Sequence, residues 1–184
     1  GHGPAAIVEQ ARCGPRGGEA AELGVPAGRG PRDHGPAQQM HPTGRHPLVE
    51  PEDVVILGLR PPSLHPDVAL ELERVPPAIA RMSAVGISAA GALEVGARWE
   101  RALRERGPAW LHLDLDVLDE ASLPAVSYPQ PLGLDWDDFV ALARPLLRSP
   151  ALVGASVADF NPDLDDPYGS YAGSIVRALQ RAAG

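Results

Sequence analysis

The sequence predicts an α/β protein, a parallel sheet with flanking helices, preceded by a part that is irregular or missing. Two observations carry this prediction. Short apolar runs alternate with longer amphipathic stretches from residue 49 onward, and strands that alternate with helices build parallel sheets. Residues 1–48, by contrast, hold ten glycines and seven prolines. We therefore expect an irregular segment at 1–48 and a partial α/β domain at 49–184.

Four strands are expected, each as a short apolar run. The clearest is 54–59, which is continuously apolar and is stopped by Arg60-Pro61-Pro62. Such a run is typical of a strand that is buried on both faces. The other expected strands are 78–82, 110–115 and 152–157.

Four helices are expected between and after these strands. Residues 89–106 place apolar side chains at helical spacing, and Gly107-Pro108 ends the pattern. Asp135 caps the next helix, with Asp138 three positions on as a short form of the capping box. The expected ranges are 67–74, 89–106, 135–147 and 170–183.

Residues 1–48 are expected to lack a packed core. Glycine and proline interrupt the segment so often that only 5–12 and 19–23 are compatible with a helix. Such a segment buries too little apolar surface to offset its ordering entropy. The chain opens on Gly1 rather than methionine, which is compatible with a fragment or a processed product.

Composition argues against several functional classes. The net charge is −8 and the pI is near 5.2, whereas nucleic-acid binders usually carry a basic patch. No apolar run approaches the roughly 18 residues of a membrane span, and no secretory signal pattern opens the chain. Cys13 is the only cysteine, so an internal disulfide is impossible and a reducing, cytoplasmic location is expected.

The strongest chemical signal is Asp114-Leu115-Asp116, followed by Asp119. Strand alternation predicts that Asp114 and Asp116 lie on the same side. Unpaired carboxylates there would repel each other and lose hydration, and a hard divalent cation removes both penalties. The D-x-D motif alone also fits solvated loop acids or a glycosyltransferase.

The residues around this motif resemble the ureohydrolase family, which includes arginase, agmatinase and formiminoglutamase. The run from His112 to Leu134 is similar to the family patterns S-x-D-x-D-x-x-D-P and P-[GA]-T-G-T-P-x-x-G-G-L. A later segment, Val157-Ala158-Asp159-Phe160-Asn161-Pro162, is similar to E-V-N-P-x-x-D. The resemblance covers about residues 50–183 and implies the C-terminal half of an arginase-like three-layer α/β/α fold.

The resemblance implies a hydrolase of linear amidine or guanidino C–N bonds that uses two Mn²⁺ ions and a bridging hydroxide. Asp114 matches the carboxylate that bridges both metals, and Asp116 matches a ligand of one. Asp159 stands where the family often has a glutamate that pairs with the substrate. Val126-Ser127-Tyr128 replaces T-G-T, so a substrate-side hydroxyl pattern is lost, although Tyr128 can still donate one hydrogen bond to a substrate. No catalytic residue is assigned; the implied partner is a small guanidino or amidine substrate, and a homo-oligomer is left open.

The chain departs from the family pattern at the metal site. The remaining family ligands lie upstream, on G-G-D-H and D-A-H-x-D segments, and D-A-H-x-D is not found. Asp33-His34 is interpreted as a chance match to G-G-D-H, and His2 lacks the aspartates of the second motif. Two ligands cannot fix two ions, so the chain alone is expected to hydrolyse guanidino substrates poorly or not at all. A non-catalytic truncated relative is the main alternative.

Three other features have ordinary interpretations. His112 is expected to be a buried histidine bonded to backbone, or else a group that supports Asp114. Asp163, Asp165 and Asp166 are expected to form a solvated turn, although the family pattern has an aspartate at Asp165. Glu120 replaces the proline that usually follows Asp119.

Overall fold

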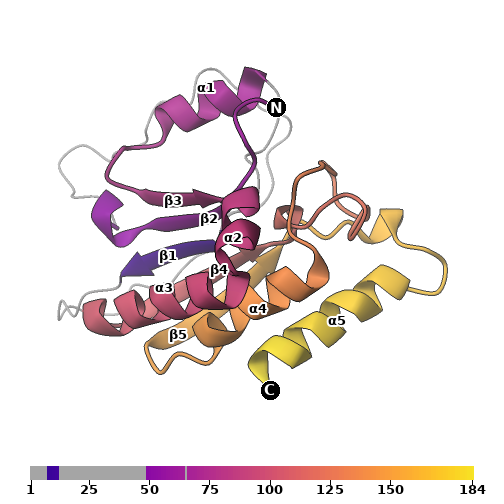
Figure 1. Ribbon diagram of the computed structural model, residues 1–184. Helices are drawn as coiled ribbons and strands as arrows, with labels where there is room; N and C mark the ends of the chain where they lie inside the picture. Colours follow the sequence, from indigo (N-terminus) through magenta and orange to yellow (C-terminus); the bar gives the residue numbers. More distant parts are fainter. Residues whose placement is uncertain (1–7, 13–48, 65) are drawn as a thin grey trace, which may run out of the picture.

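The computed structural model describes residues 8–12, 49–64 and 66–184 (Figure 1). Short 3₁₀ helices η1 (Pro51–Asp53), η2 (Leu115–Val117) and η3 (Pro162–Leu164) interrupt the connections. The strands are β1 (Val8–Arg12), β2 (Val55–Leu59), β3 (Ala80–Ser83), β4 (Ala109–Asp114) and β5 (Leu152–Ala158). The helices are α1 (Pro66–Arg74), α2 (Ala84–Ala90), α3 (Ala92–Arg106), α4 (Trp136–Leu147) and α5 (Ser170–Ala183).

The predicted α/β class is confirmed, and all four predicted strands form. They make two parallel pairs, β2 with β3 and β4 with β5. β1 pairs antiparallel with β4 and lies beside β2, so it fills the space between the two pairs (Figure 1). Parallel strands end at a common edge, and the register of Asp114 with Ala158 places the ends of β4 and β5 side by side.

The strand at Val8–Arg12 corrects the expectation for that stretch, which the sequence showed only as compatible with a helix. Its pairing is with the backbone of β4. An open strand edge offers unpaired N–H and C=O groups to any extended segment, whatever its side chains. The predictions for residues 1–7 and 13–48 lie outside the described residues.

The helix predicted at 89–106 is wrong at its start, because α3 begins at Ala92 and a separate helix, α2, ends at Ala90. α2 begins at Ala84, where the Ser83 hydroxyl accepts a hydrogen bond from the amide of Gly86. Gly91 then adopts a φ of 85° and separates α2 from α3, a conformation that glycine adopts without strain. The cap predicted for α4 is confirmed, since the Asp135 carboxylate accepts from the Asp138 amide at 2.8 Å.

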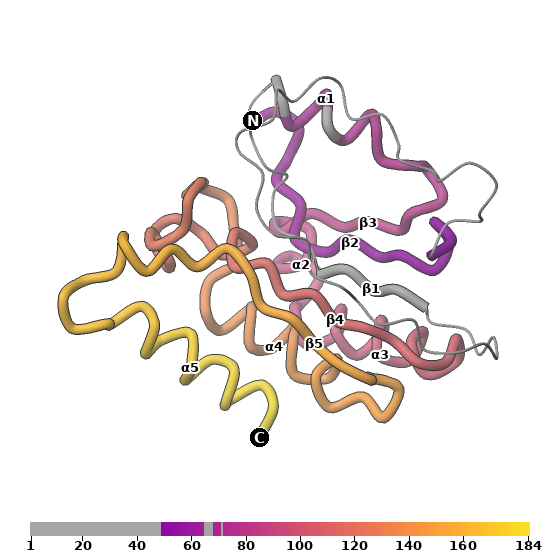
Figure 2. The backbone as a smooth tube through the Cα atoms, turned by 180° about the vertical axis from the view of Figure 1, so that it is seen from behind, coloured from indigo at the N-terminus to yellow at the C-terminus, as the bar shows by residue number. Residues whose placement is uncertain are grey.

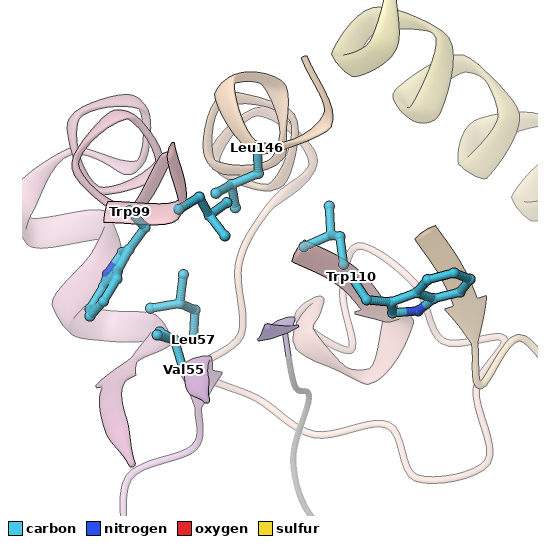
Figure 3. A pocket seen from close by; sticks show the side chains of 7 residues that line it. Val55, Leu57, Trp99, Trp110 and Leu146 are labelled. Carbon is cyan, nitrogen blue, oxygen red and sulfur yellow. The ribbon is translucent and has the colours of Figure 1, made fainter. Parts of the chain in front are cut away.

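The main core lies between the sheet and the helices α3 and α4. Alternate residues of β4, Ala109, Leu111 and Leu113, are buried there. α3 approaches α4 closely at Gly96, where a Cβ atom would lie 2.3 Å from the Leu142 carbonyl oxygen. A small apolar cavity of about 10 Å³ remains among Trp99, Leu146 and their neighbours (Figure 3), which is roughly the room of one water molecule.

The two sides of β4 and β5 are covered differently. α3, α4 and α5 gather on one side, and the reverse side of the two strands faces the viewer in Figure 2. The side chain of Trp110 is 46% exposed and lies against Gly154, where a Cβ atom would meet the indole ring at 2.3 Å. In the described part of the chain, no helix is long and apolar enough to cross a membrane.

Candidate functional site

The candidate site lies at the edge where β4 and β5 end. Asp114 is the last residue of β4, and Asp159 directly follows β5. The Asp159 carboxylate lies close enough to Asp114 for its charge to raise the pKa of Asp114. Asp116 follows two residues after Asp114, and its charge interacts with those of both other carboxylates. The structure therefore brings together three of the four residues that the sequence singled out.

The local backbone differs from the sequence prediction. The strand predicted at 110–115 ends at Asp114, and the chain turns into η2. The Asp114 carboxylate caps this turn by accepting from the Asp116 amide at 2.8 Å. The strand-alternation argument was therefore wrong for Asp116, because a tight turn and not a strand places it next to Asp114.

Burial makes the negative charges of this cluster costly. Asp114 is only 7% exposed. Its desolvation, together with the charges of Asp159 and Asp116, raises its pKa to about 7, although the Asp116 amide opposes the shift. Desolvation and the charge of Asp159 likewise raise the pKa of Asp116 to about 6, against the opposing effect of Arg60. Such a site favours a proton or another cation.

The backbone holds Asp159 in an unusual conformation. Its φ is 69°, in the left-handed region that few residues other than glycine adopt. The next residues are tied to the loop after η2, because Phe160 pairs with Val126 and the Asn161 amide donates to the Ala125 carbonyl at 2.9 Å. Tyr128, the fourth predicted residue, is 45% exposed and lies two residues beyond Val126.

Arg60 is a residue that the sequence reasoning missed. Its side chain is only 1% exposed, and its guanidinium donates to the carbonyl oxygens of residues 116–118 and of Gln130. The sequence analysis assigned Arg60 no role beyond ending the strand expected at 54–59. The available signal was a charged residue placed directly after a wholly buried strand, where a cation needs partners.

Asp119 and Glu120 organise the loop that follows η2. The Asp119 carboxylate accepts from the amides of Ala121 at 3.0 Å and Gly133 at 3.2 Å. The Glu120 amide donates to the Gln130 carbonyl at 3.0 Å, a bond that a proline could not make. The departure from the family pattern at Glu120 therefore adds a backbone hydrogen bond.

His112 differs from its first expected role. Its Nδ1 lies 2.8 Å from the Ser156 hydroxyl, so its partner is a side chain on β5 and not the backbone. The Trp110 indole also donates to this hydroxyl, at 3.3 Å.

The acidic loop before α5 corrects the expectation of a solvated turn. The Asp165 carboxylate accepts from the amides of Tyr171 and Ala172, both at 3.0 Å. Asp166 accepts from the amides of Tyr168 at 2.7 Å and Ser170 at 3.2 Å. These two acids cap the amino end of α5, which leaves four backbone N–H groups without partners inside the helix.

The carboxylates fit a divalent cation in part. Asp116 Oδ1 is buried without a hydrogen-bond partner among the described residues, and carboxylate oxygens are suitable ligands for Mn²⁺. Across residues 49–64 and 66–184, however, no group of three or more His, Cys, Asp and Glu side chains is arranged to hold an ion. The described residues therefore supply part of a metal shell.

Comparisons with known proteins identify the family of this chain. The model of the arginase family matches residues 27–182, which extends further toward the start of the chain than the motifs do. A formimidoylglutamase from Chromobacterium violaceum is 44% identical over 78 residues, 39% of this chain and 25% of the relative. One from Klebsiella aerogenes is 36% identical over 78 residues, 42% of this chain and 35% of the relative.

Solved structures show the same fold. The arginase from Bacillus caldovelox gives a TM-score of 0.62 at 26% identity, over 76% of this chain and 45% of that one. The arginase from Bacillus subtilis gives 0.63 at 24% identity, over 77% of this chain and 48% of that one. The match thus spans less than half of each solved arginase and a smaller share of the curated relatives. A D-x-D glycosyltransferase is excluded by the family match, and the chain belongs to the arginase family.

Proposed function

We propose that this chain carries part of the active site of a manganese-dependent hydrolase that cleaves linear amidine or guanidino C–N bonds. The observation that carries the proposal is the group Asp114, Asp116 and Asp159 at the carboxyl edge of an arginase-family fold. Asp114 and Asp116 are held where burial makes their charges costly, and one buried oxygen of Asp116 has no hydrogen-bond donor in the part of the chain that the structure describes. A bound cation would relieve both conditions.

Each residue has a proposed role. Asp114 and Asp116 would hold manganese, which when bound lowers the pKa of water toward neutrality. Asp159 is exposed beside them, so it would accept hydrogen bonds from the N–H groups of a cationic amidine and orient its carbon. The Tyr128 hydroxyl would donate to another polar group of the substrate.

An amidine acid is the substrate that we would test first. Formimidoylglutamate is favoured over arginine because curated relatives with up to 44% identity are named formimidoylglutamases. The loop Val126-Ser127-Tyr128 also lacks the hydroxyl pattern T-G-T of the family motif. In such a hydrolysis the water oxygen bonds to the amidine carbon and the C–N bond breaks. The products are an amide and an amine. We place this reaction in the cytoplasm, without nucleic acid or membrane.

A non-catalytic relative is the second candidate. It is favoured by the partial metal shell in the described residues. On either proposal the chain alone is a poor enzyme, because Asp114 and Asp116 cannot by themselves fix two ions.

The test is a metal and substrate panel. The purified chain would be titrated with Mn²⁺ by calorimetry and assayed with formimidoylglutamate, agmatine, guanidinobutyrate and arginine. We expect Mn²⁺ binding but turnover well below about 1 per second, the low end for ordinary enzymes. Ordinary turnover that Asp114→Ala abolishes would show that the chain holds a complete site. Absence of Mn²⁺ binding would favour the non-catalytic relative.

A further inference from the structure

The guanidinium of Arg60 donates hydrogen bonds to the backbone carbonyls of the turn that carries Asp116. Its Nη1 donates to the Val117 carbonyl at 3.2 Å, and Nη2 donates to the carbonyls of Asp116 at 2.9 Å and Leu118 at 2.8 Å. Nη2 also lies 3.3 Å from the Gln130 carbonyl, on the returning part of the same loop. One side chain from the end of β2 therefore fixes a turn more than fifty positions away.

Arg60 brings a positive charge close to the acidic residues without occupying their carboxylate oxygens. The charges of Asp119, Asp116, Asp114 and Glu120 all act on the buried guanidinium, and they help to balance a cation that is costly to bury. Every Arg60 hydrogen bond described above ends on a backbone carbonyl, however. Within residues 8–12, 49–64 and 66–184, Asp116 Oδ1 is thus left without a donor although the Arg60 guanidinium lies nearby.

The surroundings of Arg60 are packed to fit it. A Cβ atom on Gly133 would lie 2.6 Å from Nη2 and 2.3 Å from the Asp119 amide nitrogen. The Gly133 amide meanwhile donates to the Asp119 carboxylate. The loop therefore closes around the guanidinium with backbone on the side of Gly133, and no larger residue fits there without displacement.

We propose that Arg60 is a positioning residue that holds the Asp114–Asp116 turn in its ligand-ready shape before any metal binds. It does so by binding three consecutive carbonyls while leaving the carboxylate oxygens available. The link to metal binding rests on the function proposed above, but the effect on the turn does not. The competing explanation is that Arg60 only stabilises the fold as a whole.

Two substitutions separate these explanations. Arg60→Met removes the charge and all the donors, whereas Arg60→Lys keeps the charge on an ammonium group that cannot reach carbonyls in a forked geometry. Arg81→Lys is the matched control, because Arg81 is exposed and donates to the Leu72 carbonyl away from the site. All variants would be studied in the full chain at a temperature where circular dichroism shows them folded.

The first measurement is amide hydrogen exchange without metal. The reporters are the amides of Leu118, Asp119 and Leu134, which donate to the carbonyls of Leu115, Leu134 and Val117. We expect about 10-fold faster exchange at these amides in both Arg60 variants, with α5 unchanged, because the loss of bonds to a charged donor loosens the turn locally. Unchanged exchange at these amides, or an equal increase in α5, would overturn the proposal. So would failure of both variants to fold.

The second measurement is Mn²⁺ affinity by calorimetry. We expect it to be about 10-fold weaker in Arg60→Lys than in Arg81→Lys, because the ligands must be ordered on binding. Equal affinities in the two variants would overturn the link to the metal. If the unsubstituted chain binds no Mn²⁺, the proposed function fails, and the exchange experiment still decides the role of Arg60.

Discussion

The chain contains two acidic clusters that look alike in sequence and differ in their surroundings. The first is Asp114 and Asp116 at the end of β4, where burial raises both pKa values. The second is Asp165 and Asp166 before α5, where the carboxylates accept backbone amides. A hydrogen bond with Ser170, followed by backbone amides, lowers the pKa of Asp166.

The difference lies in the supply of hydrogen-bond donors. The amino end of α5 presents backbone N–H groups that have no partner within the helix, so the second cluster is satisfied by the protein itself. The turn after β4 offers the Asp116 amide to Asp114 but leaves Asp116 Oδ1 without a donor among the described residues. The comparison supports a structural role for the second cluster and, on the function proposed above, a cation-binding role for the first.

The largest expected difference between the clusters is in metal binding. Asp114→Asn should weaken Mn²⁺ affinity about 100-fold, equivalent to about 2.7 kcal/mol, because a neutral amide replaces a charged ligand. Asp165→Asn is the matched control and should change the affinity less than about 2-fold. Calorimetric titration of both variants measures this. Equal losses in the two variants would contradict the distinction.

The next effect is on the pH dependence of stability. The pKa of Asp114 is about 7 in the folded chain and 3.8 in its ordinary state. Between these values the folded state keeps a proton that the unfolded state releases, so the metal-free chain should lose stability as the pH rises from 4 to 7. After allowance for screening and coupling we expect a loss of about 2 kcal/mol.

Urea unfolding at several pH values measures this loss. Asp114→Asn should remove the part of the slope that is due to Asp114, since an amide does not titrate in this range, and should leave the part that is due to the raised pKa of Asp116. Saturating Mn²⁺ should also reduce it in the unsubstituted chain, because a bound metal replaces the proton. A stability that rises over the same pH range in the metal-free chain would refute the electrostatic description of the first cluster.

A smaller effect is expected on the structural side. Asp165→Ala removes the acceptor for the Tyr171 and Ala172 amides and should lower the free energy of unfolding by about 1–2 kcal/mol, as for other helix caps. Thermal and urea unfolding measure the change. Mn²⁺ affinity should be unaffected at temperatures where the variant is folded, and a parallel loss of affinity would show that the two clusters are coupled.

The smallest effect belongs to Asp166→Asn. The amide oxygen can still accept from Tyr168 and Ser170, so stability near neutral pH should change less than in Asp165→Ala. Because the pKa of Asp166 is lowered, its carboxylate stabilises the fold above pH 3.8 and loses this effect as the pH falls through its folded pKa. Acid titration followed by circular dichroism should show a weaker acid transition in the variant.

Periodicity predicted the elements whose burial follows a regular pattern. Five elements begin and end within a residue or two of the predicted positions: β2, β4, β5, α4 and α5. Their ends could be predicted because apolar spacing shows which face is buried. β1 could not be predicted in this way, since its partner is the backbone edge of β4. The break at Gly91 depends on a single backbone conformation that no spacing reveals.

The sequence likewise predicted only part of the candidate site. Asp114 and Asp159 could be predicted to lie together, because parallel strands share an edge and the motifs follow β4 and β5. The position of Asp116 depends on η2, a turn that begins one residue earlier than the strand pattern suggested. The role of Arg60 depends on bonds between residues far apart in sequence, which the spacing of residues along the chain does not show.

Trp110 gives the molecule an optical property. Its indole lies against Gly154 on the reverse side of β4 and β5 and is half open to water, so its fluorescence should be red-shifted relative to a buried indole. Trp99 and Trp136 belong to α3 and α4. Any molecule that settles over the indole would displace this water and shift its emission to shorter wavelengths. Replacing Trp99 and Trp136 with phenylalanine would leave Trp110 as the sole tryptophan, so that tryptophan fluorescence would report binding at this side of the sheet.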